Sequence, residues 1–265
     1  MKGFWASLSC IAFICLAGHG TAVRADSLAV DATLTGVAYN GVTVTLDLND
    51  GKGHTYGATG TAGQYQWQQN SGTYVLGKAG SFSTFCIEIT QDISLNTQYG
   101  YELTSLQNSP QPTPNYWIPN NGMGSADAAE IDRLWAADYS KVNSADSAAA
   151  FQFAIWKIIY GSQLTFSAGT PFNGSEISGD VGMASTWLAA LPTSGSGANL
   201  VALSSSSASS PNPGAQDQIT LAPPGYSAAP LPATAPAVAA LLASLGALVG
   251  LRRLLARYRV APPSL

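Results

Sequence analysis

Residues 42–48, with the sequence VTVTLDL, alternate apolar and polar side chains along the whole stretch. Alternation with a period of two is typical of a strand that buries one face and exposes the other. The next residues, 49–53 with the sequence NDGKG, have the composition of a hairpin turn. Asp47, Asn49 and Asp50 do not have the spacing of an EF-hand calcium loop, so a plain hairpin turn is the better interpretation.

The same pattern extends over residues 27–93, which we expect to be rich in strands. Residues 82–93 form a second clear candidate, with Phe85 and Ile87 on one face and Cys86 and Glu88 on the other. The chain from residue 27 to the helices described next is therefore predicted to be mainly β-structure.

Two helices are predicted after a loop rich in Pro and Asn at residues 109–124. Residues 126–139 carry apolar side chains at helical spacing, Leu134 and Trp135 among them. Ser144 has the character of an N-cap for a second helix that ends at Gly161. Its buried face would include Phe151, Ile155, Ile158 and Ile159.

Two short strand-like segments, 199–203 and 216–221, interrupt a later region rich in Ser, Gly, Ala and Pro. They are expected to return to the sheet as a final pair. The predicted fold class is therefore α+β: one β-rich domain, a sheet or sandwich, with an inserted helical pair and a C-terminal transmembrane helix.

Both ends of the chain are apolar. Residues 1–25 have the positive start, apolar run and small residues of a cleavable signal peptide, whereas the run is too short for a retained membrane helix. Near the other end, residues 237–251 are apolar or small and are followed by four arginines in the tail, 252–265. Fifteen helical residues rise about 22 Å, which is short of a ~30 Å hydrocarbon core, but membrane insertion explains the segment better than burial in a core.

This organisation predicts an extracellular domain at 26–224, a stalk and sorting motif at 225–236, a transmembrane segment at 237–251 and a basic cytoplasmic tail. The domain holds all fifteen acidic residues against five Lys and Arg, a formal net charge of −10. Because phosphate binding needs clustered Lys and Arg, we expect no nucleic-acid partner.

Signal removal would leave one cysteine, Cys86, and one histidine, His54. A lone cysteine in an exported domain cannot form an internal disulfide, so it is intermolecular, free or chemically employed. One Cys and one His are too few for an ordinary zinc site, and no metal or cofactor is expected.

Two segments have the residues for an unusual reaction: FCIE at 85–88 and FQFAIW at 151–156. A thiolate is a strong nucleophile, and the amide carbon of a glutamine is a possible target. If burial held Cys86 against Gln152, attack would expel ammonia and leave an internal thioester, with Phe85, Phe151 and Trp156 as an apolar supporting pocket. Spacing alone does not establish this.

These segments resemble the two motifs of the thioester domains of bacterial surface adhesins. The first motif is aromatic-Cys-aliphatic followed by an acidic residue. The second is an apolar residue, Gln, two variable positions, an aliphatic and usually an aromatic residue. The resemblance covers about 83–161 and implies that Cys86 is the thioester thiol and Gln152 the acyl donor. It implies a covalent adhesin for amine-bearing surface proteins or extracellular polymers, and not a turnover enzyme.

The C-terminus has a resemblance of its own. APLPA at 229–233, the apolar run and the arginines are similar to PEP-CTERM sorting signals of the Val-Pro-Leu-Pro-Ala type, with Ala229 in place of valine. That family implies processing by an exosortase and a place at the cell surface or in the biofilm matrix of a Gram-negative bacterium.

Other interpretations stay open. Cys86 is by default a small buried hydrophobic residue, the commonest fate of a cysteine. A cysteine hydrolase would pair Cys86 with His54. A passive matrix or glycan-binding protein would expose aromatic side chains together on one surface, with Tyr65, Trp67, Tyr116 and Trp117 as the candidates.

Overall fold

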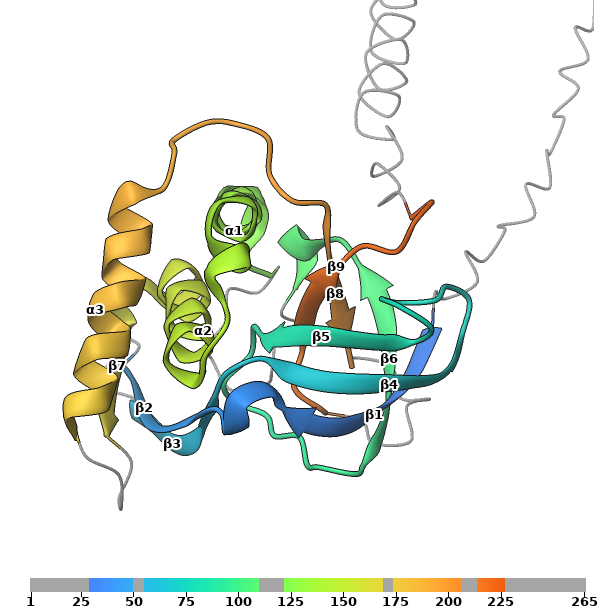
Figure 1. Ribbon diagram of the computed structural model, residues 1–265, viewed down its shortest axis with the longest axis horizontal. Coiled ribbons are helices and arrows are strands. Elements are labelled where there is room, and N and C mark those ends of the chain that lie inside the picture. Colours follow the sequence, from blue (N-terminus) through green and yellow to red (C-terminus); the bar gives the residue numbers. More distant parts are fainter. Residues whose placement is uncertain (1–28, 50–54, 110–121, 169–173, 206–213, 227–265) are drawn as a thin grey trace, which may run out of the picture.

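The computed structural model describes residues 29–49, 55–109, 122–168, 174–205 and 214–226. These residues form an α+β fold in which a β-barrel lies beside three helices and a second, smaller sheet (Figure 1). The signal, stalk, transmembrane and tail segments expected at the two ends lie outside the described residues.

The barrel is built from six antiparallel strands: β1 (Ala29–Val37), β4 (Tyr65–Gly72), β5 (Ser81–Cys86), β6 (Gln98–Thr104), β8 (Leu200–Ser204) and β9 (Gln218–Leu221). Their order around the barrel is β1-β4-β5-β9-β8-β6, and β1 pairs with both β4 and β6 to close it. The two last strands of the chain therefore complete a barrel that the first residues begin. The expected return of the C-terminal strands is confirmed, but the sheet closes on itself and is neither an open sheet nor a sandwich.

The smaller sheet has the order β3-β2-β7, with β2 (Val42–Asn49), β3 (Thr55–Ala62) and β7 (Leu164–Ala168). The predicted hairpin is confirmed, since β2 and β3 pair antiparallel from Val42↔Ala62 to Asn49↔Thr55. Gly41 leads the chain from the barrel into this sheet with φ +63°, and a Cβ there would lie 2.4 Å from the Thr61 side chain. Only glycine fits this junction without displacing a neighbour.

The helices are α1 (Gly124–Asp138), α2 (Ala145–Tyr160) and α3 (Gly174–Ala190), and single 3-10 turns occupy Ala38–Asn40, Leu106–Asn108, Tyr139–Lys141 and Gly161–Gln163. The first two are the predicted pair. Helix α2 is central: it packs on α1, on α3 and on all three strands of the smaller sheet. Its capping box is complete, because the Ser144 side chain accepts from the Ser147 N–H while the Ser147 hydroxyl accepts from the Ser144 N–H.

Two elements differ from expectation. The strand predicted over 82–93 ends at Cys86, and both faces of the segment are buried, so its alternation does not separate core from solvent. Helix α3 was not predicted, because Gly179 and Gly182 lower its helix propensity. It is stabilised by packing, with Ala184 and Trp187 buried and the Trp187 ring 6.2 Å from that of Phe151.

Within the described residues, none of the helices is both long and apolar enough to cross a membrane. The stretch 237–251, for which such a helix was expected, is not among those residues.

Candidate functional site

Cys86 is the last residue of β5 and lies where the barrel meets α2. On one side β5 pairs with β9, with Cys86 opposite Gln218, and the Ile87 N–H donates to the Asp217 carbonyl at 3.0 Å. On the other side the pairing with β4 ends at Thr84↔Tyr65. Beyond that point the main chain of Cys86 needs other hydrogen-bond partners, because an unpaired buried peptide group is costly.

Gln152 supplies those partners. Its Oε1 accepts from the Cys86 N–H at 2.9 Å, and its Nε2 donates to the Cys86 carbonyl at 2.7 Å. The carboxamide thus continues the sheet where β4 has ended. Both residues are completely buried.

Residues 148–150 of helix α2 are all alanine and are fully buried. Aromatic rings from β5 and from the helices pack together nearby: Phe85 lies 4.8 Å from Phe151 and 5.7 Å from Trp135, ring centre to ring centre. Trp156, one turn beyond Gln152, is 2% exposed and stacks on Phe166 at 6.3 Å. Of the three residues expected to form the supporting pocket, Phe85 and Phe151 contact each other, and Trp156 lies beside the Cys86 thiol.

The thiol is buried among these groups. Sγ of Cys86 donates to the Glu88 carbonyl at 2.6 Å. Burial, and then the negative charge of Glu88, raise the pKa of the Cys86 thiol well above its ordinary value. The Trp156 indole lies beside the thiol and offsets part of the rise, although its N–H makes no hydrogen bond of normal geometry with any described residue. The resting group at neutral pH is therefore the thiol and not the thiolate.

Glu88 adds a buried carboxyl group next to the thiol. Its side chain accepts from the N–H and the hydroxyl of Thr90, and the residue is 1% exposed. Burial raises the pKa of Glu88 to about 8, against the opposing effect of the Thr90 hydrogen bonds. A carboxyl group with such a pKa can give up or take on a proton near neutral pH.

A buried polar chain supports the other side of Cys86. The Trp67 indole donates to Thr84 Oγ1 at 2.8 Å, and that hydroxyl donates to Gln218 Oε1, also at 2.8 Å. Tyr160 of α2 donates to the Ile87 carbonyl at 3.1 Å. Sequence reasoning did not find Gln218, because nothing in the 216–221 segment indicates that it returns to the strand of Cys86.

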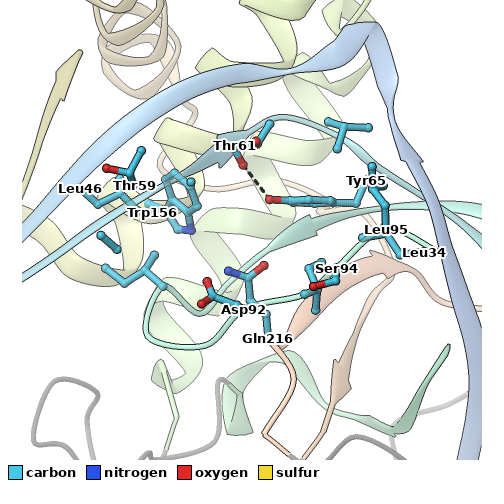
Figure 2. Close-up of a pocket in the computed structure, with 15 residues that line it drawn as sticks. Leu34, Leu46, Thr59, Thr61, Tyr65, Asp92, Ser94, Leu95, Trp156 and Gln216 are labelled. Atoms are coloured by element: carbon cyan, nitrogen blue, oxygen red, sulfur yellow. Dashed lines mark hydrogen bonds between the residues drawn. The ribbon is translucent and has the colours of Figure 1, made fainter. Parts of the chain in front are cut away.

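A cavity of about 470 Å³ lies on the far side of Trp156 from the helical core (Figure 2). It is lined by β3, by the segment 89–95 that follows the cysteine motif, and by residues from β1, β4 and the approach to β9. Sequence reasoning missed this cavity as well, since its walls come from seven separate stretches of chain, β2 and α2 included. Because Trp156 is also beside the thiol, one indole ring separates the cavity from Cys86.

Two of the four aromatic residues proposed for sugar stacking are buried in the structure. Tyr65 and Trp67 are 7% and 2% exposed and belong to the core, while Tyr116 and Trp117 lie outside the described residues. His54 also lies outside them, so the structure does not relate it to Cys86. No three His, Cys, Asp or Glu side chains converge on a metal-binding geometry within the described ranges.

This arrangement can polarise an amide carbonyl that is held on the main chain of a cysteine. The Cys86 N–H aimed at Gln152 Oε1 is the kind of donor that stabilises negative charge on a carbonyl oxygen during attack at its carbon. The carboxamide is held on the main chain of the residue that carries the nucleophile, so orientation costs little further entropy.

No protein-family model, curated protein or solved structure matches this chain.

Proposed function

We propose that Cys86 and Gln152 form an internal thioester and that the protein uses it to attach covalently to amine-bearing surface proteins or polymers. The observation that carries the proposal is the paired hydrogen bond between the Gln152 carboxamide and the Cys86 main chain, in a site closed by aromatic rings. These two bonds fix the carboxamide of Gln152 on the residue that carries the thiol.

Formation of the bond would proceed in one balanced exchange. Sγ of Cys86 attacks Cδ of Gln152, the C–N bond to Nε2 breaks, and the thiol proton leaves with the nitrogen as ammonia. The Cys86 N–H stabilises the charge that develops on Oε1. Burial then protects the product, because water that cannot reach the carbonyl cannot hydrolyse it.

Attachment would use the same carbon, Cδ of Gln152, as the electrophile. A primary amine attacks Cδ, the C–S bond breaks, and the proton lost by the amine returns to Sγ. The product is a stable amide to Gln152 and a free Cys86 thiol. Each molecule reacts once, so the proposed protein is a covalent adhesin and not a turnover enzyme.

The two apolar ends of the chain support an activity outside the cell. The proposal includes export through the segment 1–25, insertion of 237–251 in the membrane, and processing of the APLPA-containing tail by an exosortase-type enzyme. An amine acceptor on a neighbouring surface or in the matrix would then lie within reach of the domain.

The test is the mass of the purified protein, with the peptides that carry Cys86 and Gln152 mapped before and after methylamine treatment. The expected result is a mass lower by one ammonia, a cross-link between the two peptides, and a methylamide on Gln152 after treatment. Cys86→Ala and Gln152→Ala variants should have their full masses and no adduct. An unmodified wild-type mass with a free thiol would overturn the proposal and favour a passive matrix component.

A further inference from the structure

The cavity beside Trp156 has a composition that the thioester alone does not explain. Its walls include the apolar side chains of Leu34, Leu46 and Ile93 and the oxygen-bearing side chains of Thr59, Asp92 and Ser94. Of the residues that line it, Asp92 is the one with a formal charge, and no Lys or Arg is among them. A long apolar wall with a carboxylate suits a ligand that is itself an alkyl chain with a positive end.

Trp156 connects this cavity with the reacting atoms. The ring is 2% exposed, it lines the cavity, and it lies close enough to Cys86 to lower the pKa of the thiol. Its N–H is a buried donor without a hydrogen-bond acceptor among the described residues. Figure 2 shows the indole nitrogen on the side of the ring that faces Asp92 and Gln216. A buried donor of this kind is unusual unless something else occupies the space it faces.

Resting on the thioester proposed above, we propose that this cavity is the acceptor site and that it selects an unbranched alkyl chain ending in a primary ammonium, as a lysine side chain presents. Asp92 at the exposed side of the cavity attracts the cation, and the apolar wall receives the methylene chain. The indole of Trp156 then moves aside or admits the amine along its edge toward Gln152.

The chemistry balances without a further reactant. The ammonium loses one proton to water and attacks Cδ of Gln152 as the neutral amine. The C–S bond breaks, and the second proton of the amine goes to Sγ of Cys86. During this step the Trp156 N–H is placed to donate to the departing thiolate.

Two variants and three nucleophiles test the site in the full-length protein. Asp92→Asn removes the charge with little change in shape. Gly60→Leu fills the cavity from β3, because a Cβ at Gly60 meets nothing within 4 Å, and Gly182→Leu on the exposed face of α3, equally open, is its matched control. Adduct formation is followed by mass with n-butylamine, with glucosamine as a hindered ring amine, and with hydroxylamine, which is uncharged at neutral pH.

We expect n-butylamine to react faster than glucosamine. Asp92→Asn should slow n-butylamine by roughly two- to fivefold, the range of an exposed ion pair, and leave hydroxylamine unchanged. Gly60→Leu should slow n-butylamine by roughly tenfold or more, and Gly182→Leu should not.

Equal rates in all variants, or a faster reaction with glucosamine, would overturn the acceptor site while the thioester itself remained. Absence of the ammonia loss in the wild-type protein would instead remove the thioester, so the two failures are distinguishable. If Gly60→Leu fails to fold by circular dichroism, the comparison of n-butylamine with hydroxylamine in Asp92→Asn still decides the question.

Discussion

The carboxamide of Gln152 makes a two-way hydrogen bond with the main chain of Cys86, accepting from its N–H at 2.9 Å and donating to its carbonyl at 2.7 Å. One side chain thereby takes the place of a neighbouring strand. The contact joins residues 66 positions apart and couples the barrel to the helical layer. Several measurable properties depend on it.

Gln152→Ala is expected to lower the free energy of unfolding by about 2–4 kcal/mol, because it leaves a buried N–H and a buried carbonyl of Cys86 without partners. Gln64→Ala is the control. Gln64 is also buried but donates to the hydroxyl of Tyr139, so its loss should cost only about 1 kcal/mol. Urea denaturation measures both, and equal effects would contradict the special role of Gln152.

The Trp156 indole is expected to hold down the pKa of the Cys86 thiol. In a Gln152→Ala background, where the thiol is free, adding Trp156→Phe should raise that pKa further above its ordinary value. The midpoint of thiolate absorbance, measured against a Cys86→Ala reference, reports the change. Trp135→Phe also removes a buried indole N–H without a hydrogen bond among the described residues, and it should leave the midpoint in place.

Stability should decrease with rising pH because of Glu88. Its pKa is about 8 in the folded protein and 4.5 as the ordinary value, so the folded state binds the proton more tightly than the unfolded state. The resulting stabilisation is complete below about pH 4.5 and is lost as the pH rises to about 8.

Between these two pH values the free energy of unfolding should fall by a few kcal/mol, because each unit of pKa difference is equivalent to about 1.4 kcal/mol. Urea denaturation across the window, repeated with Glu88→Gln, provides the measurement. The variant should have a much flatter dependence. A Glu88→Gln protein with the full wild-type slope would assign the effect to another group.

The capping box of α2 should contribute to the position of Gln152. Ser144→Ala removes the side-chain acceptor of the Ser147 N–H and should cost about 1 kcal/mol. Ser144→Asp keeps an acceptor and should be close to wild type. Thermal denaturation measures the difference, and an unchanged melting temperature in Ser144→Ala would show that the cap is dispensable.

Local patterns predicted much of the fold. The alternation in 42–48 corresponds to β2, and the helical periodicity before Gly161 corresponds to α2 with its cap at Ser144. Barrel closure was not predictable, because it depends on pairing between strands far apart in the chain, such as β6 with β8. The strand expected to continue past Cys86 ends there, where the Gln152 side chain of α2 takes the place of β4.

The candidate site divides in the same way. Cys86, Gln152, Phe85, Phe151 and Trp156 could be named from two short motifs and are together in the structure. The cavity, with Asp92 and Gly60 on its walls, could not be predicted from the sequence. Its residues are ordinary in type and are brought together only by the packing of the smaller sheet against the barrel.

The late position of β8 and β9 in the chain has a consequence for the order of folding. Until residues 200–221 are available, β5 lacks its neighbour β9, β6 lacks its neighbour β8, and the barrel has two open edges. Contacts between such distant segments form slowly. Cys86 would then become sealed only in the final step of folding, so a reactive bond between it and Gln152 would mature after the chain has emerged. When refolding is monitored simultaneously by tryptophan fluorescence and by ammonia release, the fluorescence change should come first.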